Sequence, residues 1–327
     1  MLTLFRTNQV FYSVLLVFYI LLLRFIVFIA PFQWQPSGQG ILSEWVYGWI
    51  GYQQLASQAA AILLLLVQGF LVNLITINHR LANEVNLFPG LFYVFVCSAV
   101  PDFLYLSPVL IGNTFILIAL NEIFGTYKVP TCADRIFNAG LWTGVASLFY
   151  FPFVFFLLVL LASLSILRTL NLQEILMIFS GMVLPYFLGA TYFLWFDRFD
   201  YFMEVQVWRN LDFFHFAGLL HSWDTYAKLF LFAAMLLFVL ANYNAYLIKK
   251  NIQVQKKVGI LYWVLAIAGF SLPFQALPTF EHFLMLAPSL GIFLAFTFSN
   301  MKSQWAESIH FLMVVVALAL QFVPWQL

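Results

Sequence analysis

Apolar runs long enough to cross a lipid bilayer recur from one end of this chain to the other. A helix needs about 20 apolar residues to cross the roughly 30 Å hydrocarbon core of a membrane. When proline, glycine and charged residues divide the runs, about eleven spans are predicted. They cover residues 10–31, 55–77, 88–104, 108–124, 137–150, 153–167, 175–196, 226–247, 258–274, 283–299 and 309–323. Several are short and bounded by proline, so half-spans are expected where neighbouring helices satisfy the freed backbone groups.

Composition excludes a water-soluble protein. The 327 residues are 64% hydrophobic and only 8% charged, whereas a soluble domain is about 25% charged. The formal net charge of +1 gives no basis for binding nucleic acid. The cysteines, Cys97 and Cys132, have no CxxC spacing, so neither a disulfide nor a zinc or haem site is predicted. We therefore expect one all-α integral membrane domain, residues 1–327, folded as a polytopic bundle with no soluble domain.

Basic residues predict the orientation of the bundle, because Lys and Arg near span ends gather in the cytoplasm. With a cytoplasmic N-terminus and eleven spans, ten of the fourteen basic residues fall on the cytoplasmic side. They are Arg6, Arg80, Lys128, Arg135, Arg168, Lys249, Lys250, Lys256, Lys257 and Lys302. The run at 10–31 lacks a small-x-small cleavage site and is expected to remain as the first span. A multi-pass membrane protein follows, with its N-terminus in the cytoplasm and its C-terminus on the outer side.

Two outer segments, 32–54 and 197–224, are rich in Trp and Tyr and are expected to form amphipathic helices in the outer interface. Glu44 is the single charge of the first outer loop. It is interpreted either as part of an anchor helix or as a catalytic acid or base. The second interpretation makes Glu44 a candidate catalytic residue, since carboxylates of the first outer loop serve membrane glycosyltransferases that use polyprenyl-linked donors, although a single carboxylate has no spacing signal.

Arg24 lies inside the first span, where a charge needs a partner. Asp102, after Pro101 at the outer end of the third span, is the predicted partner. The pair is interpreted as structural, or alternatively as part of a site in which Asp102 is catalytic and Arg24 contacts a substrate phosphate or carboxylate.

The outer segment 197–224 holds most of the remaining ionisable groups. Its predicted substrate-binding residues are Arg209, Asp212, His215, His221 and Asp224. Their D-x-x-H and H-x-x-D pairs would present His and Asp on one helical face, but the spacing between the histidines matches no known metal-ligand pattern, so no metal is predicted. The alternative is an amphipathic helix whose charges simply face water.

Polar residues within the spans are expected to hold helices together rather than to react. This group contains Gln68, Asn73, Asn113 and Asn121, while Glu122 is expected to reach Lys128. His282 is a candidate proton carrier at the outer end of the tenth span.

Blocks spread over nearly the whole chain resemble a family of Bacteroidota inner-membrane proteins of unknown function. They include Asn78 to Leu81, Asn86 to Val94, Asn113 to Leu120, Asp134 to Tyr150, and His282 to Asn300. The family has no established activity, and the resemblance implies an envelope setting in a diderm bacterium. Related chains commonly carry basic residues after the fourth span, where this one has Asn121 and Glu122.

Three classes of function remain, and whether the protein is an enzyme stays open. The favoured one is an enzyme or carrier for a lipid-linked glycan at the outer face, with a polyprenyl-phosphate substrate among the membrane lipids. The alternatives are a non-catalytic scaffold with envelope protein partners, and a secondary transporter. No P-loop or other cofactor motif is present in the sequence, so the cofactor is unknown. The first class predicts that the outer carboxylates surround one cavity.

Overall fold

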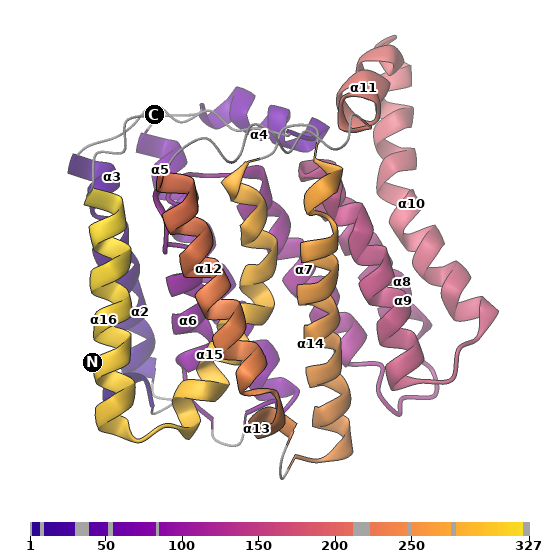
Figure 1. Cartoon of the computed structure of the whole chain (residues 1–327). Coiled ribbons are helices and arrows are strands. Elements are labelled where there is room, and N and C mark those ends of the chain that lie inside the picture. Colours follow the sequence, from indigo (N-terminus) through magenta and orange to yellow (C-terminus); the bar gives the residue numbers. More distant parts are fainter. Residues whose placement is uncertain are drawn as a thin grey trace.

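The computed structural model describes residues 2–6, 10–29, 39–51, 55–82, 85–211, 223–247, 250–275 and 279–322. These residues form helices and connecting turns, with no strand among them. Most helices run side by side between two faces, called here the upper and lower face as they stand in Figure 1. The predicted all-α polytopic bundle is confirmed.

Each predicted span overlaps a helical element of the described residues. In chain order these are α2 (Val10–Leu23) with α3 (Ile26–Ile29), α5 (Leu55–Asn78), α6 (Phe88–Val96) with η1 (Pro101–Phe103), α7 (Pro108–Phe124), α8 (Ala133–Phe149), η2 (Phe151–Phe155) with α9 (Phe156–Leu167), α10 (Leu172–Trp195), α12 (Trp223–Ala241) with α13 (Tyr243–Leu247), α14 (Ile252–Phe270) with η5 (Leu272–Phe274), η6 (Phe280–Leu286) with α15 (Ala287–Asn300), and α16 (Ser303–Phe322).

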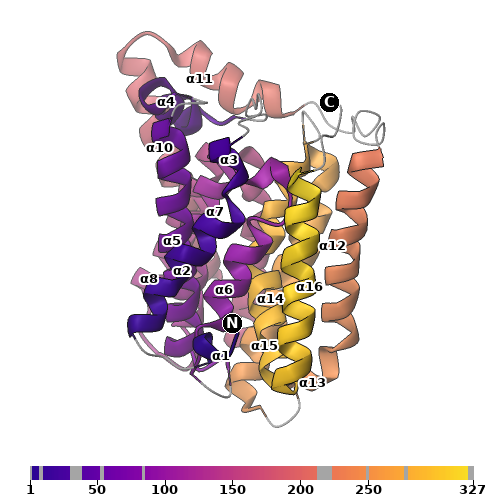
Figure 2. The ribbon, with the colours of Figure 1, turned by 90° about the vertical axis from the view of Figure 1, so that its left-hand side faces the viewer.

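Four of these elements are long and apolar enough to cross a membrane by themselves, within the described residues: α5, α10, η6 with α15, and α16. Shorter apolar helices include α7, η2 with α9, and most of α2 and α12. The short helix α1 (Leu2–Phe5) lies toward the lower face, and α16 ends at the upper face (Figure 2). The first and last described helices thus place the two ends of the bundle on opposite faces, as an odd number of crossings requires.

The helix α6 shows how a broken span is tolerated in the core. Its nine residues rise only about 14 Å, roughly half of a bilayer's hydrocarbon core. All nine are buried, mainly against α15 and α5. Glycines permit the close approach, because a Cβ on Gly90 would lie 2.4 Å from the carbonyl oxygen of Gly69, and one on Gly291 would lie 2.7 Å from the Cα of Tyr93. The expected half-span is therefore present, enclosed by protein rather than lipid.

Small residues also set the contact between α8 and α10. A Cβ on Gly144 would lie 2.4 Å from the carbonyl oxygen of Met182, and one on Gly181 would lie 2.3 Å from that of Phe137. Backbones this close gain packing that larger side chains would prevent. The opposite side of α10 exposes apolar residues such as Leu176, Val183 and Phe187, as expected of a helix at the lipid boundary.

Two helices cross the upper face instead of spanning the bundle (Figures 1 and 2). They are α4 (Ile41–Ile50) and α11 (Phe199–Gln206), which continues into the turn η3 (Trp208–Asn210). The helix α4 buries Ile41, Ser43 and Tyr47 and exposes Trp45 and Trp49. The expected interfacial amphipathic helices are thus present, although the second ends before residue 212.

Candidate functional site

The upper end of α8 fixes the start of α4. The backbone N–H of Gly40 donates to the carbonyl oxygen of Phe149 at 2.9 Å, and the hydroxyl of Ser43 donates to the same oxygen at 2.7 Å. A Cβ at residue 40 would lie 2.1 Å from the carbonyl oxygen of Leu148, so glycine is required at this approach. These contacts set where Glu44, in the first turn of α4, stands on the upper face.

Gln206 joins α11 to the same anchor. Its side-chain amide donates to the carbonyl oxygen of Ser147 at 2.9 Å and accepts from the N–H of Ile41 at 3.0 Å. The chain reaches α11 through a turn at Asp197, whose φ of 53° lies in the left-handed region that Asp tolerates better than most residues. One buried glutamine therefore links three helices, and α4 and α11 form a single platform.

On this platform the carboxylate of Glu44 lies between the guanidinium of Arg209 and the phenol of Tyr201. Its Oε1 is 3.5 Å from Nη1 of Arg209, and its Oε2 accepts a hydrogen bond from the hydroxyl of Tyr201. The hydrogen bond to the carboxylate, helped by partial burial, raises the pKa of Tyr201 to about 12. Arg209 also lies 4.0 Å from Glu204. The group is partly open to solvent, with 24% of the Glu44 side chain exposed.

A pocket of about 360 Å³ opens beside this carboxylate. Its lining consists of Ile41, Glu44, Trp45, Phe193, Arg198 and Tyr201. Trp45 meets Tyr192 of α10 edge to face, with ring centroids 5.7 Å apart. The pocket therefore combines a carboxylate, a guanidinium and aromatic walls, and it lies next to the apolar outer surface of α10.

Arg24 and Asp102 do not pair in the structure. Arg24 is 1% exposed and donates to the carbonyl oxygens of Leu104 (2.9 Å), Phe103 (3.0 Å) and Cys97 (3.2 Å), as well as to the hydroxyl of Ser98 at 3.4 Å. The guanidinium thus satisfies the backbone where α6 breaks. The prediction that Asp102 neutralises Arg24 is wrong, because backbone oxygens solve the desolvation problem instead.

Asp102 instead forms an ion pair with Lys228 of α12, whose Nζ lies 2.6 Å from Oδ2. Asp102 does not line the pocket beside Glu44. The two predicted catalytic carboxylates therefore belong to separate groups on the upper side of the bundle. A catalytic role for Asp102 and a phosphate contact for Arg24 stay predictions.

Some predicted residues lie outside the described part of the chain. These are Asp212, His215 and His221, while Asp224 falls at the start of α12. Arg209 is described and contacts Glu44, so one residue of the second outer segment does meet the first outer loop. Within the described residues, no group of three His, Cys, Asp or Glu side chains converges to hold a metal ion.

Sequence reasoning missed two residues of the pocket, Arg198 and Tyr201. Both belong to the outer segment 197–224, whose charges and aromatic residues are expected to face water or to anchor an amphipathic helix. Their spacing of three residues, at the start of a short amphipathic helix, places both side chains on one face and was the available signal. The sequence has no signal that this face of α11 meets α4.

The polar residues inside the spans join helices, as expected. Gln68 donates to the carbonyl oxygen of Leu110 and accepts from the hydroxyl of Tyr93, while Asn113 donates to the carbonyl oxygen of Leu284. His282 is buried between the hydroxyls of Tyr150 and Ser271, each at 2.9 Å. These contacts account for the packing role. The role of His282 as a proton carrier stays a prediction.

No protein-family model and no curated protein matches the chain. Among solved structures, the chain is similar to the crystal structure of ArnT from Cupriavidus metallidurans bound to undecaprenyl phosphate, with a TM-score of 0.54 and 13% sequence identity. The match covers 93% of this chain and 62% of that chain. The bundle thus has the fold of a known polytopic membrane protein, and this chain spans less than two thirds of its length.

Proposed function

We propose that this protein handles a lipid-linked glycan at the upper face, as a glycosyltransferase-like enzyme with Glu44 as its general base. The observation that carries the proposal is the pocket that brings Glu44, Arg198 and Tyr201 together beside the apolar surface of α10. The similar fold of ArnT, which holds undecaprenyl phosphate in its crystal structure, supports a polyprenyl-phosphate substrate.

The arrangement fits transfer of a sugar from a polyprenyl-phosphate carrier. Glu44 accepts the proton of an acceptor hydroxyl as its oxygen attacks the anomeric carbon. The bond between that carbon and the phosphate oxygen breaks, and the leaving polyprenyl phosphate keeps the electron pair. Arg198 and Arg209 stabilise the phosphate, because guanidinium groups form paired, charge-assisted hydrogen bonds with phosphate oxygens. A carboxylate has about four acceptor positions, so Glu44 retains some beyond its bonds to Tyr201 and Arg209.

Arg24 is left out of this mechanism. A phosphate at Arg24 would have to displace carbonyl oxygens of the break after α6, which would then lose their hydrogen-bond donors. The more exposed Arg209 needs no such displacement.

The orientation of the protein belongs to the same proposal. The lower face carries Lys128, Arg135, Lys256 and other basic residues, which supports a cytoplasmic lower face and a periplasmic upper face in the bacterial inner membrane. A carrier lipid would then reach the pocket from the outer leaflet along α10.

Native mass spectrometry of the full-length protein with added undecaprenyl phosphate tests the lipid step. We expect the native protein to retain the lipid and the Arg198→Gln, Arg209→Gln pair to lose it by about tenfold or more. Glu44→Gln should keep the lipid but lower transfer from a polyprenyl-phosphate sugar by about 10²–10⁴-fold, the usual contribution of a general base. Arg6→Gln is the control on the lower face and should change neither.

Retention that survives loss of both arginines would contradict the phosphate assignment. Full transfer activity in the Glu44→Gln protein would contradict the base assignment. A stoichiometric protein partner without bound lipid would instead favour the scaffold interpretation.

A further inference from the structure

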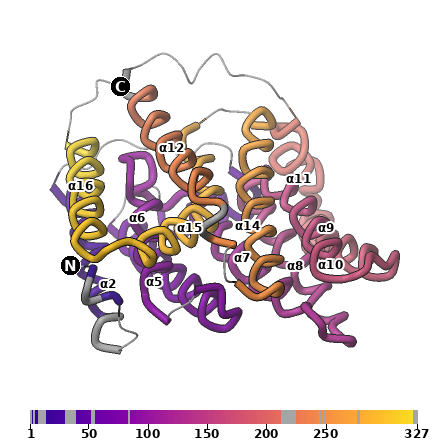
Figure 3. The backbone as a smooth tube through the Cα atoms, turned by 60° about the horizontal axis from the view of Figure 1, so that its bottom comes forward, coloured from indigo at the N-terminus to yellow at the C-terminus, as the bar shows by residue number. Residues whose placement is uncertain are grey.

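Basic side chains from several elements meet at the lower face. They come from the end of α5 (His79), the loop after α7 (Lys128), the start of α8 (Arg135) and the start of α14 (Lys256 and Lys257). Figure 3, with the lower face turned forward, shows α7, α8 and α14 near one another on this side. We call these five residues the lower basic cluster.

Lys257 is the most buried member, with 2% of its surface exposed. Its Nζ lies 3.0 Å from Nδ1 of His79 and 5.8 Å from the ring centroid of Phe124. Because an ammonium only donates, Nδ1 accepts, and the other ring nitrogen of His79 donates to the side-chain oxygen of Asn121 at 3.1 Å. The histidine is therefore neutral in this arrangement, and within the described part of the chain no carboxylate pairs with the buried ammonium of Lys257.

The remaining lysines share one aromatic ring. The Nζ atoms of Lys128 and Lys256 each lie 5.6 Å from the ring centroid of Tyr127, within the range of a cation–π contact. Two like charges held on one ring repel each other. Arg135 adds a third positive group nearby, since its guanidinium packs where a Cβ of Gly125 would be, at 1.8 Å.

Among the described residues, no carboxylate is paired with this cluster. Glu122 and Asp134 lie on the same elements, but within the described residues neither forms an ion pair with a member of the lower basic cluster. The expected contact from Glu122 to Lys128 is thus not formed. Uncompensated cations at this density are costly unless an anion joins them.

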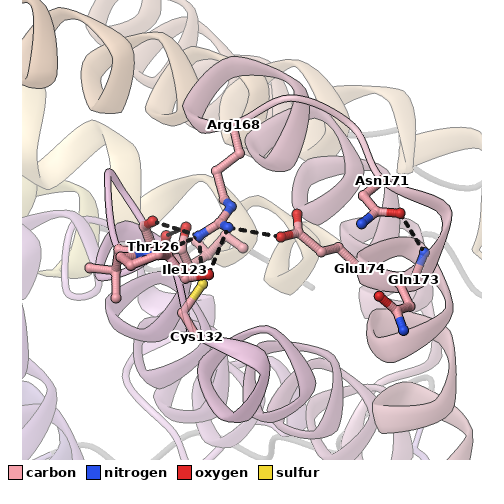
Figure 4. Close-up of polar contacts among 9 residues, drawn as sticks. Ile123, Thr126, Cys132, Arg168, Asn171, Gln173 and Glu174 are labelled. Carbon is pink, nitrogen blue, oxygen red and sulfur yellow. Dashed lines mark hydrogen bonds and ion pairs between the residues drawn. The ribbon is translucent and has the colours of Figure 1, made fainter.

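The backbone of the loop that carries Tyr127 and Lys128 is held in place by Arg168, the residue that follows α9. Arg168 donates to the carbonyl oxygens of Thr126 and Pro130, to that of Val129, and to the sulfur of Cys132 (Figure 4). Its other partner is Glu174 of α10, at 3.0 Å. The position of Lys128 is therefore fixed by the protein before any ligand arrives.

We propose that the lower basic cluster binds a phosphate group. Several cations close together suit a ligand that has more than one acceptor oxygen and can have more than one negative charge. Arg135 and Lys128 are exposed to solvent, whereas Lys257 is buried. The ligand is the phosphate of an anionic lipid headgroup in the adjoining leaflet or a free phosphate, which share this chemistry.

Thermal unfolding of the full-length protein in a neutral detergent tests the site with two probes: dioleoylphosphatidylglycerol against dioleoylphosphatidylcholine, and inorganic phosphate. The test variant is the Lys128→Gln, Lys256→Gln pair. The matched control is Arg6→Gln with Lys302→Gln, which removes two exposed basic residues of the same face outside the cluster.

We expect a probe to stabilise the native protein and the control, and its apparent affinity to fall about tenfold or more in the test variant. Protection by phosphatidylglycerol alone identifies a lipid headgroup, and protection by inorganic phosphate identifies a free anion. Without a probe, the test variant should be as stable as the native protein or slightly more stable, since like charges are removed. Equal losses in both variants, or no protection of the native protein by either probe, would overturn the site.

Discussion

Two groups of charges on the upper side differ from the lower basic cluster in how charge is balanced. In the upper groups acids and bases are paired: Arg209 lies near both Glu44 and Glu204, and Asp102 pairs with Lys228. The pair of Arg168 and Glu174 on the lower side lies outside the cluster. The lower basic cluster has cations and rings but no carboxylate contact among the described residues. The upper group is also held on helices that cross the face, whereas the lower one lies at the ends of spanning helices.

This difference separates two ways of preparing a site for an anion. Arg209 lies next to the carboxylate of Glu44, so a phosphate bound to Arg209 must compete with that carboxylate. The described residues offer the lower basic cluster no paired carboxylate, so an anion bound there relieves repulsion among its cations. A buried cation without a carboxylate can, however, be satisfied by other acceptors, such as backbone carbonyl oxygens.

Arg24 provides the sharpest test of that distinction, because it is a buried cation whose partners are three carbonyl oxygens and one hydroxyl, with no carboxylate among them. Arg24→Leu should lower the free energy of unfolding by about 4 kcal/mol, since several backbone acceptors at the break after α6 would lose their donors. Unfolding in mixed micelles measures it. Arg24→Lys should recover only part of the loss, because an ammonium lacks the fork of the guanidinium. A loss below about 1 kcal/mol would show that the carbonyls find other donors.

The ion pair of Asp102 and Lys228 tests compensation on the upper side. Asp102→Asn should lower the free energy of unfolding by about 3 kcal/mol, because the ammonium of Lys228 is largely buried and would lose this carboxylate. The double variant Asp102→Asn, Lys228→Met removes the charge as well and should recover most of the stability. The same unfolding assay compares them. Equal destabilisation of single and double variants would mean that packing, not charge, sets the value of the pair.

The sequence predicted the spans because a bilayer imposes one strong rule, about 20 apolar residues for each crossing. It also predicted that a broken span would need partners. It did not predict the partners of Arg24. These are backbone carbonyl oxygens, and because every residue has a carbonyl group, no residue type marks them. Composition carries no signal for such a contact.

The candidate site was predicted in part. Glu44 stood out as a lone charge in an outer loop, and Arg209 was included among the ionisable groups of the second outer segment. Their contact depends on Gln206, which bridges α4, α8 and α11 from a position that no motif marks. Long-range geometry of this kind is set by packing, which a single sequence does not encode in local patterns.

The smallest expected effect is a pH dependence of the upper group. The phenol of Tyr201 donates a hydrogen bond to the carboxylate of Glu44, and mainly for this reason its pKa is raised from 10.0 to about 12. The hydrogen bond therefore stabilises the fold fully below pH 10, and its contribution is lost as the pH rises from 10 to 12. The difference in tyrosinate absorbance between the native protein and Tyr201→Phe should show a midpoint near 12. Glu44→Gln should bring that midpoint back toward 10 and Arg209→Gln should raise it, since Arg209 lowers the pKa of the phenol. A midpoint near 10 in the native protein would mean that Tyr201 and Glu44 are apart in solution, and Glu44 would then keep Arg209 but lose the phenol that the structure places on its second oxygen.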